Sequence, residues 1–140
     1  NRGDKMKSMI EQLNQIKNKI IYITHPSIDK SFYDQYVRSD YIQLISPVDY
    51  LKMSELIQNC KGIISDSGGL QEEAACANKK ILICRDTTER VEIIECGYGK
   101  LVDDQIINNI SFFDIEISSS IKNPYGENVS EKITKIVKNL

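Results

Sequence analysis

The sequence has no tryptophan, one histidine and only three prolines in 140 residues. Its four cysteines form no Cys-x-x-Cys pair, and a single histidine cannot complete a zinc site with them. The 18 lysines and arginines against 20 acidic residues give a net charge of -2 without a basic run. This balance argues against nucleic acid or an anionic membrane as a partner. We therefore expect no metal site and no nucleic-acid or membrane surface.

Long hydrophobic runs are also missing. No apolar stretch approaches the roughly 18 residues needed to cross a bilayer, and the first residues lack the layout of a signal peptide. Cysteine usage and the absence of a targeting segment predict a reduced, cytoplasmic chain. The length and the 41% hydrophobic content fit one domain spanning residues 1–140. The sequence begins at Asn1 without an initiator methionine, so we expect a fragment of a longer protein.

Short apolar runs alternate with helical patterns at intervals of about 20 residues. The runs expected to be strands lie at 20–23, 42–45, 62–64, 81–84 and 100–102. A first helix is expected over 4–18. Three more helices are indicated by apolar residues at helical spacing: Phe32, Tyr36 and Val37 in the first, Met53, Leu56, Ile57 and Cys60 in the second, and Leu70, Ala74 and Ala77 in the third. This alternation predicts an α/β fold with a Rossmann-like parallel sheet and helices on both faces. An antiparallel layout would favour tight Asn-Gly turns, and the sequence has none.

The C-terminal part is less regular. Residues 111–122 are expected to form a loop or a weak strand, and Asn123-Pro124-Tyr125-Gly126 a turn. Asn128 and Glu131 have the spacing of a capping box, which predicts a last helix to the end of the chain.

Ligands of an open parallel sheet bind at the carboxyl ends of its strands, and three polar loops follow predicted strands. Ser67-Gly68-Gly69 lies between a strand and a helix, where free amides and the helix dipole favour an anion. A tight turn capped by Asp66 or Ser67 is an equally good interpretation. Thr87-Thr88-Glu89-Arg90 follows the next strand and fits phosphate or sugar binding, or else a solvated loop.

Two acidic residues follow the glycines. Glu72 and Glu73 suit the first turns of a helix simply because carboxylates there stabilise it. A carboxylate one turn past the glycines could also accept hydrogen bonds from ribose hydroxyls. His25, the single histidine, is either a general base or the first residue of a loop, and we favour the loop. The cysteines are interpreted as core residues.

Taken together, Asp66-Ser67-Gly68-Gly69-Leu70-Gln71-Glu72-Glu73-Ala74, Arg85-Asp86-Thr87-Thr88-Glu89-Arg90 and Asn123-Pro124-Tyr125-Gly126 closely resemble the UDP-N-acetylglucosamine 2-epimerase family of the non-hydrolysing type. The resemblance keeps the family's order and spacing over nearly the whole chain. It implies the C-terminal, UDP-holding half of a two-domain glycosyltransferase B-type enzyme, with the N-terminal catalytic domain absent. The implied reaction interconverts UDP-N-acetylglucosamine and UDP-N-acetylmannosamine by eliminating UDP and adding it back after inversion at C2, without a cofactor, for cell-surface polysaccharide synthesis.

The resemblance also implies residue roles. Ser67, Gly68 and Gly69 would hold the diphosphate, Glu73 the ribose, and Arg90 the nucleotide-sugar side of the cleft. Two further positions are matched outside these motifs: Met53 for the uracil and His25 for a second, regulatory nucleotide-sugar site. The implied partners are a UDP-sugar, the N-terminal domain of the same enzyme and a second copy in a homodimer.

The sequence departs from the family where Val91 replaces a proline and Asn128 a glycine. The family's catalytic carboxylates and catalytic histidine would lie outside this chain, so no catalytic residue is assigned and we expect the segment alone to be inactive. The family domain also opens with a strand near the middle of its sheet, before the helix at 4–18. The alternatives are a hydrolysing 2-epimerase, a stand-alone nucleotide-sugar binding module, or a flavodoxin-like domain that binds another ligand.

Overall fold

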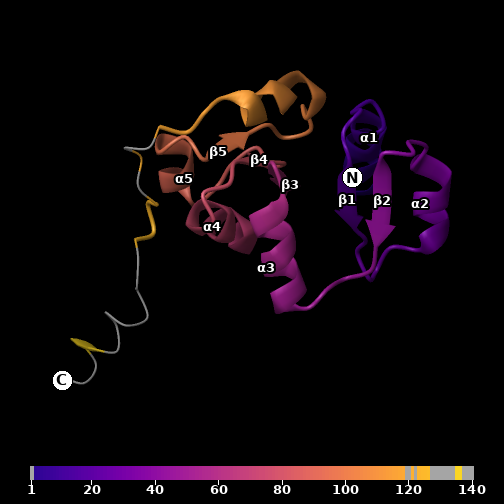
Figure 1. Ribbon diagram of the computed structural model, residues 1–140. Helices are drawn as coiled ribbons and strands as arrows, with labels where there is room; N and C mark the ends of the chain where they lie inside the picture. Colours follow the sequence, from indigo (N-terminus) through magenta and orange to yellow (C-terminus); the bar gives the residue numbers. More distant parts are fainter. Residues whose placement is uncertain (1, 119–120, 122, 127–134, 137–140) are drawn as a thin grey trace.

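The computed structural model describes residues 2–118, 121, 123–126 and 135–136, and Figure 1 shows the course of the chain. Helices and strands alternate as the apolar runs predicted. In chain order they are α1 (Arg2–Leu13), β1 (Ile20–Ile23), α2 (Lys30–Tyr36), β2 (Ile42–Ile45), α3 (Tyr50–Asn59), β3 (Ile63–Ser65), α4 (Gly68–Cys76), β4 (Ile81–Ile83), α5 (Val91–Glu95), β5 (Gly99–Leu101) and the 3-10 helix η1 (Ile107–Asp114).

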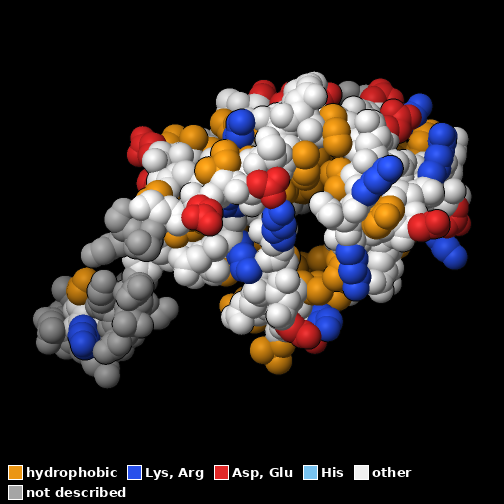
Figure 2. All heavy atoms as spheres, turned by 45° about the horizontal axis from the view of Figure 1, so that its top comes forward, with side chains coloured by type: hydrophobic (Ala, Val, Ile, Leu, Met, Phe, Trp, Pro, Cys, Tyr) orange, Lys and Arg blue, Asp and Glu red, His pale blue; other side chains and the backbone are white. Residues whose placement is uncertain are grey.

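All pairing between these strands is parallel, as predicted, but the strands form two sheets rather than one. β1 pairs with β2, with Ile20 opposite Ile42, while β3, β4 and β5 form a second sheet in that order. Within the described residues, β1 and β3 each pair along one side only. Figure 2 shows an opening between the two halves of the molecule, with hydrophobic side chains around it.

Strand β4 shows why both faces of the larger sheet are covered. Its side chains alternate between two clusters, because successive residues of a strand point to opposite faces. Ile81 and Ile83 belong to the cluster on the α4 and α5 side, whereas Leu82 and the following Cys84 belong to the cluster on the α1 and η1 side. All four are at most 1% exposed. The burial of the whole strand explains its continuous apolar sequence.

Helix α1 connects the two sheets. Its buried Leu13 packs in the same cluster as Ile42 of β2 and Leu82 of β4. The Gln12 side chain accepts a hydrogen bond from the Ile107 amide of η1 at 3.0 Å and also donates to the Asp104 carbonyl. One continuous core therefore joins both sheets, although no backbone ladder does within the described residues.

The first helix is shorter than predicted, ending at Leu13 instead of residue 18. Asn14 explains the early end. Its side-chain oxygen accepts from the amides of Arg38 and Ser39 at 2.9 and 3.2 Å, and its amide group donates to the Tyr36 carbonyl at 2.8 Å. These bonds hold Asn14 against the segment between α2 and β2. The periodicity continues to Ile16 because that residue is buried in the turn.

The prediction of a loop or weak strand over 111–122 is wrong in its first part, because η1 extends through residues 111–114. Lys80 stabilises the end of η1. Its ammonium group is buried with the side chain, lies 4.5 Å from the centre of the Phe112 ring, and donates to the carbonyls of Phe112 and Ile115. The turn at 123–126 is confirmed, with the Tyr125 amide donating to Asn123 Oδ1 at 2.9 Å. Most of the predicted last helix lies outside the described residues.

None of the helices in the described part of the chain combines the length and the apolar character that a membrane span requires.

Candidate functional site

The turn between β3 and α4 leaves donors exposed at a helix N-terminus. Ser67 is the N-cap of α4, and its Oγ accepts from the Leu70 amide at 3.5 Å. The amides of Gly68 and Gly69 occupy the first two helical positions, where a helix offers no acceptor of its own. No acceptor for either amide is found among the described residues. These donors, together with the positive end of the helix dipole, can bind an anion.

Arg90 lies directly beside this turn. A Cβ atom built on Gly68 would meet Arg90 Nη1 at 2.5 Å and Cζ at 2.9 Å. The guanidinium therefore covers the position where a side chain at residue 68 would project, and only glycine leaves that space free. The loop after β4 and the turn after β3 lie side by side, as the sequence predicted.

Two carboxylates hold the Arg90 guanidinium. Its Nε donates to Glu72 Oε1 at 2.7 Å, and its Nη1 donates to Glu89 Oε1. The second oxygen of Glu89 lies 3.3 Å from Arg85 Nη1. The Arg90 side chain is 24% exposed, whereas those of Glu72 and Glu89 are 48% and 61% exposed. Two arginines and two carboxylates thus form one partly exposed ion network at the mouth of the turn.

The ion network changes the pKa values of its members. The hydrogen bond that Arg90 donates to Glu72 raises the pKa of the guanidinium, which stays charged. A backbone hydrogen bond lowers the pKa of the Glu89 carboxyl, and the charges of Arg85 and Arg90 act in the same direction. Both ends of the Glu89–Arg90 pair are therefore ionised at neutral pH.

A separate set of hydrogen bonds holds the backbone of the Arg90 loop. Thr88 Oγ1 donates to Gln71 Oε1 at 2.7 Å and accepts from the Arg90 amide at 3.1 Å. Gln71 is 0% exposed, and its Nε2 has no partner among the described residues. The α4 helix thus positions Arg90 twice, through the Gln71–Thr88 bond to the backbone and through Glu72 to the guanidinium.

The turn at 123–126 reaches the same part of the molecule. Asn123 Nδ2 lies 3.2 Å from Cys76 Sγ, at the end of α4. Burial raises the pKa of the Tyr125 hydroxyl, and the charges of Glu92 and Glu72 add to this effect. The hydroxyl has no hydrogen-bond partner among the described residues. All three motifs that carry the family resemblance therefore meet around α4.

Glu73 lies on a different side of α4 from the ion network, in a pocket of about 180 Å³ between α3 and α4. The pocket is lined by Tyr50, Ser54, Ile57, Gln58, Glu73, Cys76 and Ala77. Drug-sized ligands occupy roughly 300–1,000 Å³, so this pocket has room for only part of a nucleotide. Glu73 supplies a carboxylate one turn beyond the glycines, and Ser54 and Tyr50 of α3 supply a hydroxyl and an aromatic ring.

The remaining predicted site residues lie elsewhere. Met53 is half-buried on α3 and is not among the residues that line the Glu73 pocket. His25 follows β1 in the two-stranded sheet, where its Nδ1 lies 2.7 Å from Ser27 Oγ and its amide donates to the Tyr33 hydroxyl at 2.9 Å. No hydrogen bond or ion pair among the described residues connects His25 with Ser67 or Arg90.

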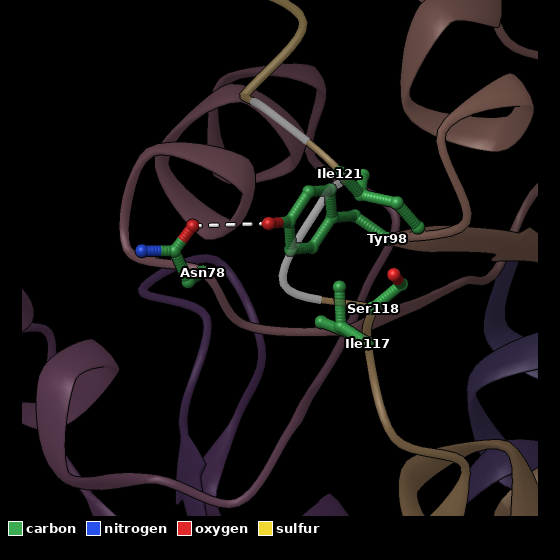
Figure 3. A pocket seen from close by; sticks show the side chains of 5 residues that line it. All are labelled: Asn78, Tyr98, Ile117, Ser118 and Ile121. Carbon is green, nitrogen blue, oxygen red and sulfur yellow. Dashed lines mark hydrogen bonds between the residues drawn. The ribbon is translucent and has the colours of Figure 1, made fainter.

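A larger pocket, of about 390 Å³, lies at the opposite ends of the strands (Figure 3). Its residues Asn78 and Tyr98 precede β4 and β5, and the Tyr98 hydroxyl donates to Asn78 Oδ1 at 3.0 Å. Ile117, Ser118 and Ile121 complete the lining. Ligands of parallel sheets bind at the carboxyl ends of the strands, so we do not assign the site to this pocket.

Within the described residues, no group of three or more His, Cys, Asp or Glu side chains is placed to hold a metal ion. The four cysteines are free thiols, and the interpretation of all four as core residues is wrong for Cys76, which is exposed near the end of α4. Burial raises the pKa of Cys84 to about 12, and it also raises the pKa of Cys60. Neither thiol is therefore a ready nucleophile.

Sequence analysis missed the pocket-lining Tyr50 and Ser54 and the carboxylate partners of Arg90. The spacing of Tyr50 and Ser54 was an available signal, because residues four apart share one face of a helix. For Glu89 no signal existed, since a charged residue in a polar loop is ordinarily solvated.

The fold and this site define a class: a doubly wound parallel α/β domain with a glycine turn at the carboxyl end of a strand and an arginine beside it. Comparison with known proteins refines the class. The profile of the family described as UDP-N-acetylglucosamine 2-epimerase matches residues 1–138. The chain belongs to this family, and its fold matches the C-terminal half of the glycosyltransferase B-type epimerase structures.

Comparison with individual relatives agrees with this family assignment. A UDP-N-acetylglucosamine 2-epimerase homolog of Methanococcus maripaludis is 34% identical, over 98% of this chain and 41% of its own length. The Methanocaldococcus jannaschii epimerase in complex with UDP-GlcNAc and UDP matches with a TM-score of 0.86 and 30% identity, over 100% of this chain and 42% of that one. The Neisseria meningitidis epimerase bound to UDP-GlcNAc matches with a TM-score of 0.75 and 28% identity, over 99% and 41% of the two chains. The chain thus spans about two fifths of the length of these relatives.

Proposed function

We propose that this chain is the UDP-binding half of an enzyme that interconverts UDP-N-acetylglucosamine and UDP-N-acetylmannosamine. The observation that carries the proposal is the position of the Arg90 guanidinium against Gly68, at the start of α4 and one helical turn before Glu73. Relatives of matching fold have been solved with UDP-GlcNAc and UDP bound, which supports the same ligand class here.

In this proposal each group of the site binds one part of the ligand. The glycine amides, the Ser67 hydroxyl and Arg90 bind the diphosphate, because backbone donors and a guanidinium match phosphate oxygens. Glu73 accepts hydrogen bonds from the ribose hydroxyls. In this arrangement the phosphates are not repelled by the two nearby carboxylates. Glu73 lines a separate pocket with α3 residues, and Arg90, which binds Glu72, would lie between Glu72 and the phosphates. Met53, on the helix that also supplies Tyr50 and Ser54, borders the uracil.

The proposed reaction eliminates UDP and the C2 proton to give a 2-acetamidoglucal, and then adds UDP to C1 and a proton to the opposite face of C2, which inverts that centre. The contribution of this half is to stabilise the departing UDP. Negative charge develops on the phosphate oxygen as the bond to the sugar breaks, and preorganised amides and a guanidinium lower the energy of that charge. The carboxylates that move the C2 proton would be supplied by the N-terminal domain of the same enzyme.

The further parts of the proposal concern assembly and regulation. The complete enzyme is a cytoplasmic homodimer, and His25 belongs to a second, regulatory nucleotide-sugar site. His25 is exposed at the end of β1, so a ligand could reach its ring.

UDP titration of the purified chain by calorimetry tests the binding function. We expect saturable 1:1 binding, and the absence of heat at millimolar UDP would contradict the proposal. The chain alone should not convert UDP-N-acetylglucosamine, which proton NMR of the anomeric signal would detect. In the complete protein, UDP-N-acetylmannosamine as product supports the proposed reaction, whereas free N-acetylmannosamine indicates the hydrolysing type. Binding by the complete protein without any turnover indicates a stand-alone binding module.

A further inference from the structure

We propose that Glu89 is an internal substitute for the ligand's phosphate, holding the Arg90 guanidinium until the diphosphate displaces it, while Glu72 is the permanent positioning residue of Arg90. The inference rests on the proposed function, because it concerns how the same site accepts a diphosphate.

The two carboxylates bind different edges of the guanidinium. Glu72 is fixed on α4 and takes Nε, the nitrogen nearest the backbone of Arg90. Glu89 takes Nη1, which is the guanidinium nitrogen closest to Gly68. A phosphate bound to the amides of Gly68 and Gly69 would therefore meet the edge that Glu89 occupies and leave the Glu72 contact intact.

Glu89 is also the partner that can move. Its side chain is 61% exposed and projects from a loop, so rotation exposes no buried group. Arg85 already lies 3.3 Å from its second oxygen and can retain the carboxylate after it leaves Arg90. An exposed ion pair of this kind contributes little stability, so its exchange for a phosphate is energetically feasible.

Electrostatics give the two carboxylates opposite effects on binding. Without Glu89, the diphosphate would meet no competing anion at Nη1 and less repulsion. Without Glu72, Nε would lose its partner, and the guanidinium would be free to leave the space over Gly68. Removing the Glu89 charge thus strengthens diphosphate binding, whereas removing the Glu72 charge weakens it. A simple change in net charge would shift the affinity in the same direction in both variants.

The test compares three isosteric variants of equal charge change by calorimetry with UDP, uridine and inorganic pyrophosphate. We expect Glu89→Gln to bind UDP about two- to fivefold more tightly and Glu72→Gln about three- to tenfold more weakly. The matched control is Glu95→Gln, an exposed residue at the end of α5, which should stay within about twofold. Uridine has no phosphate to contact Arg90, so it should bind equally to all three variants. A merely structural effect of a substitution would change the affinity for uridine as well.

Two further variants keep the outcome decisive. Glu89→Gln combined with Arg90→Ala should show no gain over Arg90→Ala alone, since the competition takes place at the guanidinium. Glu72→Asp keeps the charge but shortens the reach, and should lie between the wild type and Glu72→Gln; it replaces Glu72→Gln if that variant does not fold.

The outcomes separate this inference from the proposed function. UDP binding with unchanged or parallel shifts in both variants overturns the inference and leaves the function intact. Opposite shifts for pyrophosphate without any binding of UDP support the inference and overturn the nucleotide function. A wild-type chain that binds neither probe overturns both.

Discussion

The Arg90 guanidinium occupies the space in which a side chain at Gly68 would lie, with Nη1 2.5 Å from the position of the missing Cβ. This contact links two loops that are separated by a helix and a strand. It also explains the requirement for glycine at residue 68 without invoking unusual backbone angles, since Gly68 is not among the residues with positive φ.

Replacing Gly68 with alanine should move the guanidinium and weaken UDP binding roughly tenfold, because a charge-assisted contact is lost. Folding should be little affected, since the new methyl group meets the end of a flexible side chain. Gly69→Ala is the control for stability: a Cβ there meets only Ser67 Oγ, at 4.0 Å. Calorimetry and thermal unfolding measure both effects. Unchanged UDP affinity in Gly68→Ala would show that Arg90 does not contact the ligand.

Glu73→Ala should weaken UDP binding by about 1–3 kcal/mol, because a charged acceptor for the ribose hydroxyls is lost. Unlike the changes at Glu72 and Glu89, it should weaken uridine binding equally, since the nucleoside alone contains the ribose. Titrations of both ligands, with Glu95→Ala as the control, measure the difference. Normal uridine binding by Glu73→Ala would rule out the ribose assignment.

Thr88→Val should lower the free energy of unfolding by about 1–3 kcal/mol. The change removes the donor to Gln71 Oε1 and the acceptor of the Arg90 amide, and it leaves both polar atoms of the buried Gln71 unpaired. Thr87→Val removes an exposed hydroxyl from the same loop and is the matched control. Urea denaturation gives the comparison, and equal stability of the two variants would contradict the role of the Gln71–Thr88 bond.

Backbone amides of β4 should exchange with deuterium at least tenfold more slowly than those of β1 and β3. Strand β4 is paired on both sides and buried along its whole length, whereas β1 and β3 are paired on one side within the described residues. Exchange followed by mass spectrometry tests this expectation. A strand inserted between β1 and β3 would slow exchange in both strands at once. Equal protection of β1, β3 and β4 in the chain alone would contradict the division into two sheets.

Local sequence patterns predicted most of the elements correctly. The strands at 20–23 and 42–45 agree with their apolar runs, although Ile21 and Gln43 are exposed. Among the described strands, β4 alone is buried along its whole length, as a parallel strand covered on both faces should be. The first helix was predicted too long, since Ile16 continues its periodicity although Asn14 binds a distant segment. The 3-10 helix at 107–114 was missed because its partner, Lys80, comes from another part of the chain.

The sequence by itself determined the alternation of strands and helices, the glycine turn after β3 and the three motifs that identify the family, because these depend on neighbouring residues and on their order. Only the tertiary structure decided that Arg90 covers Gly68, that Glu72 and Glu89 share its guanidinium, and that Tyr50 and Glu73 line one pocket. The physical reason is that side chains from different loops and helices meet according to how the helices pack on the sheet. Sequence spacing within one element does not contain that information.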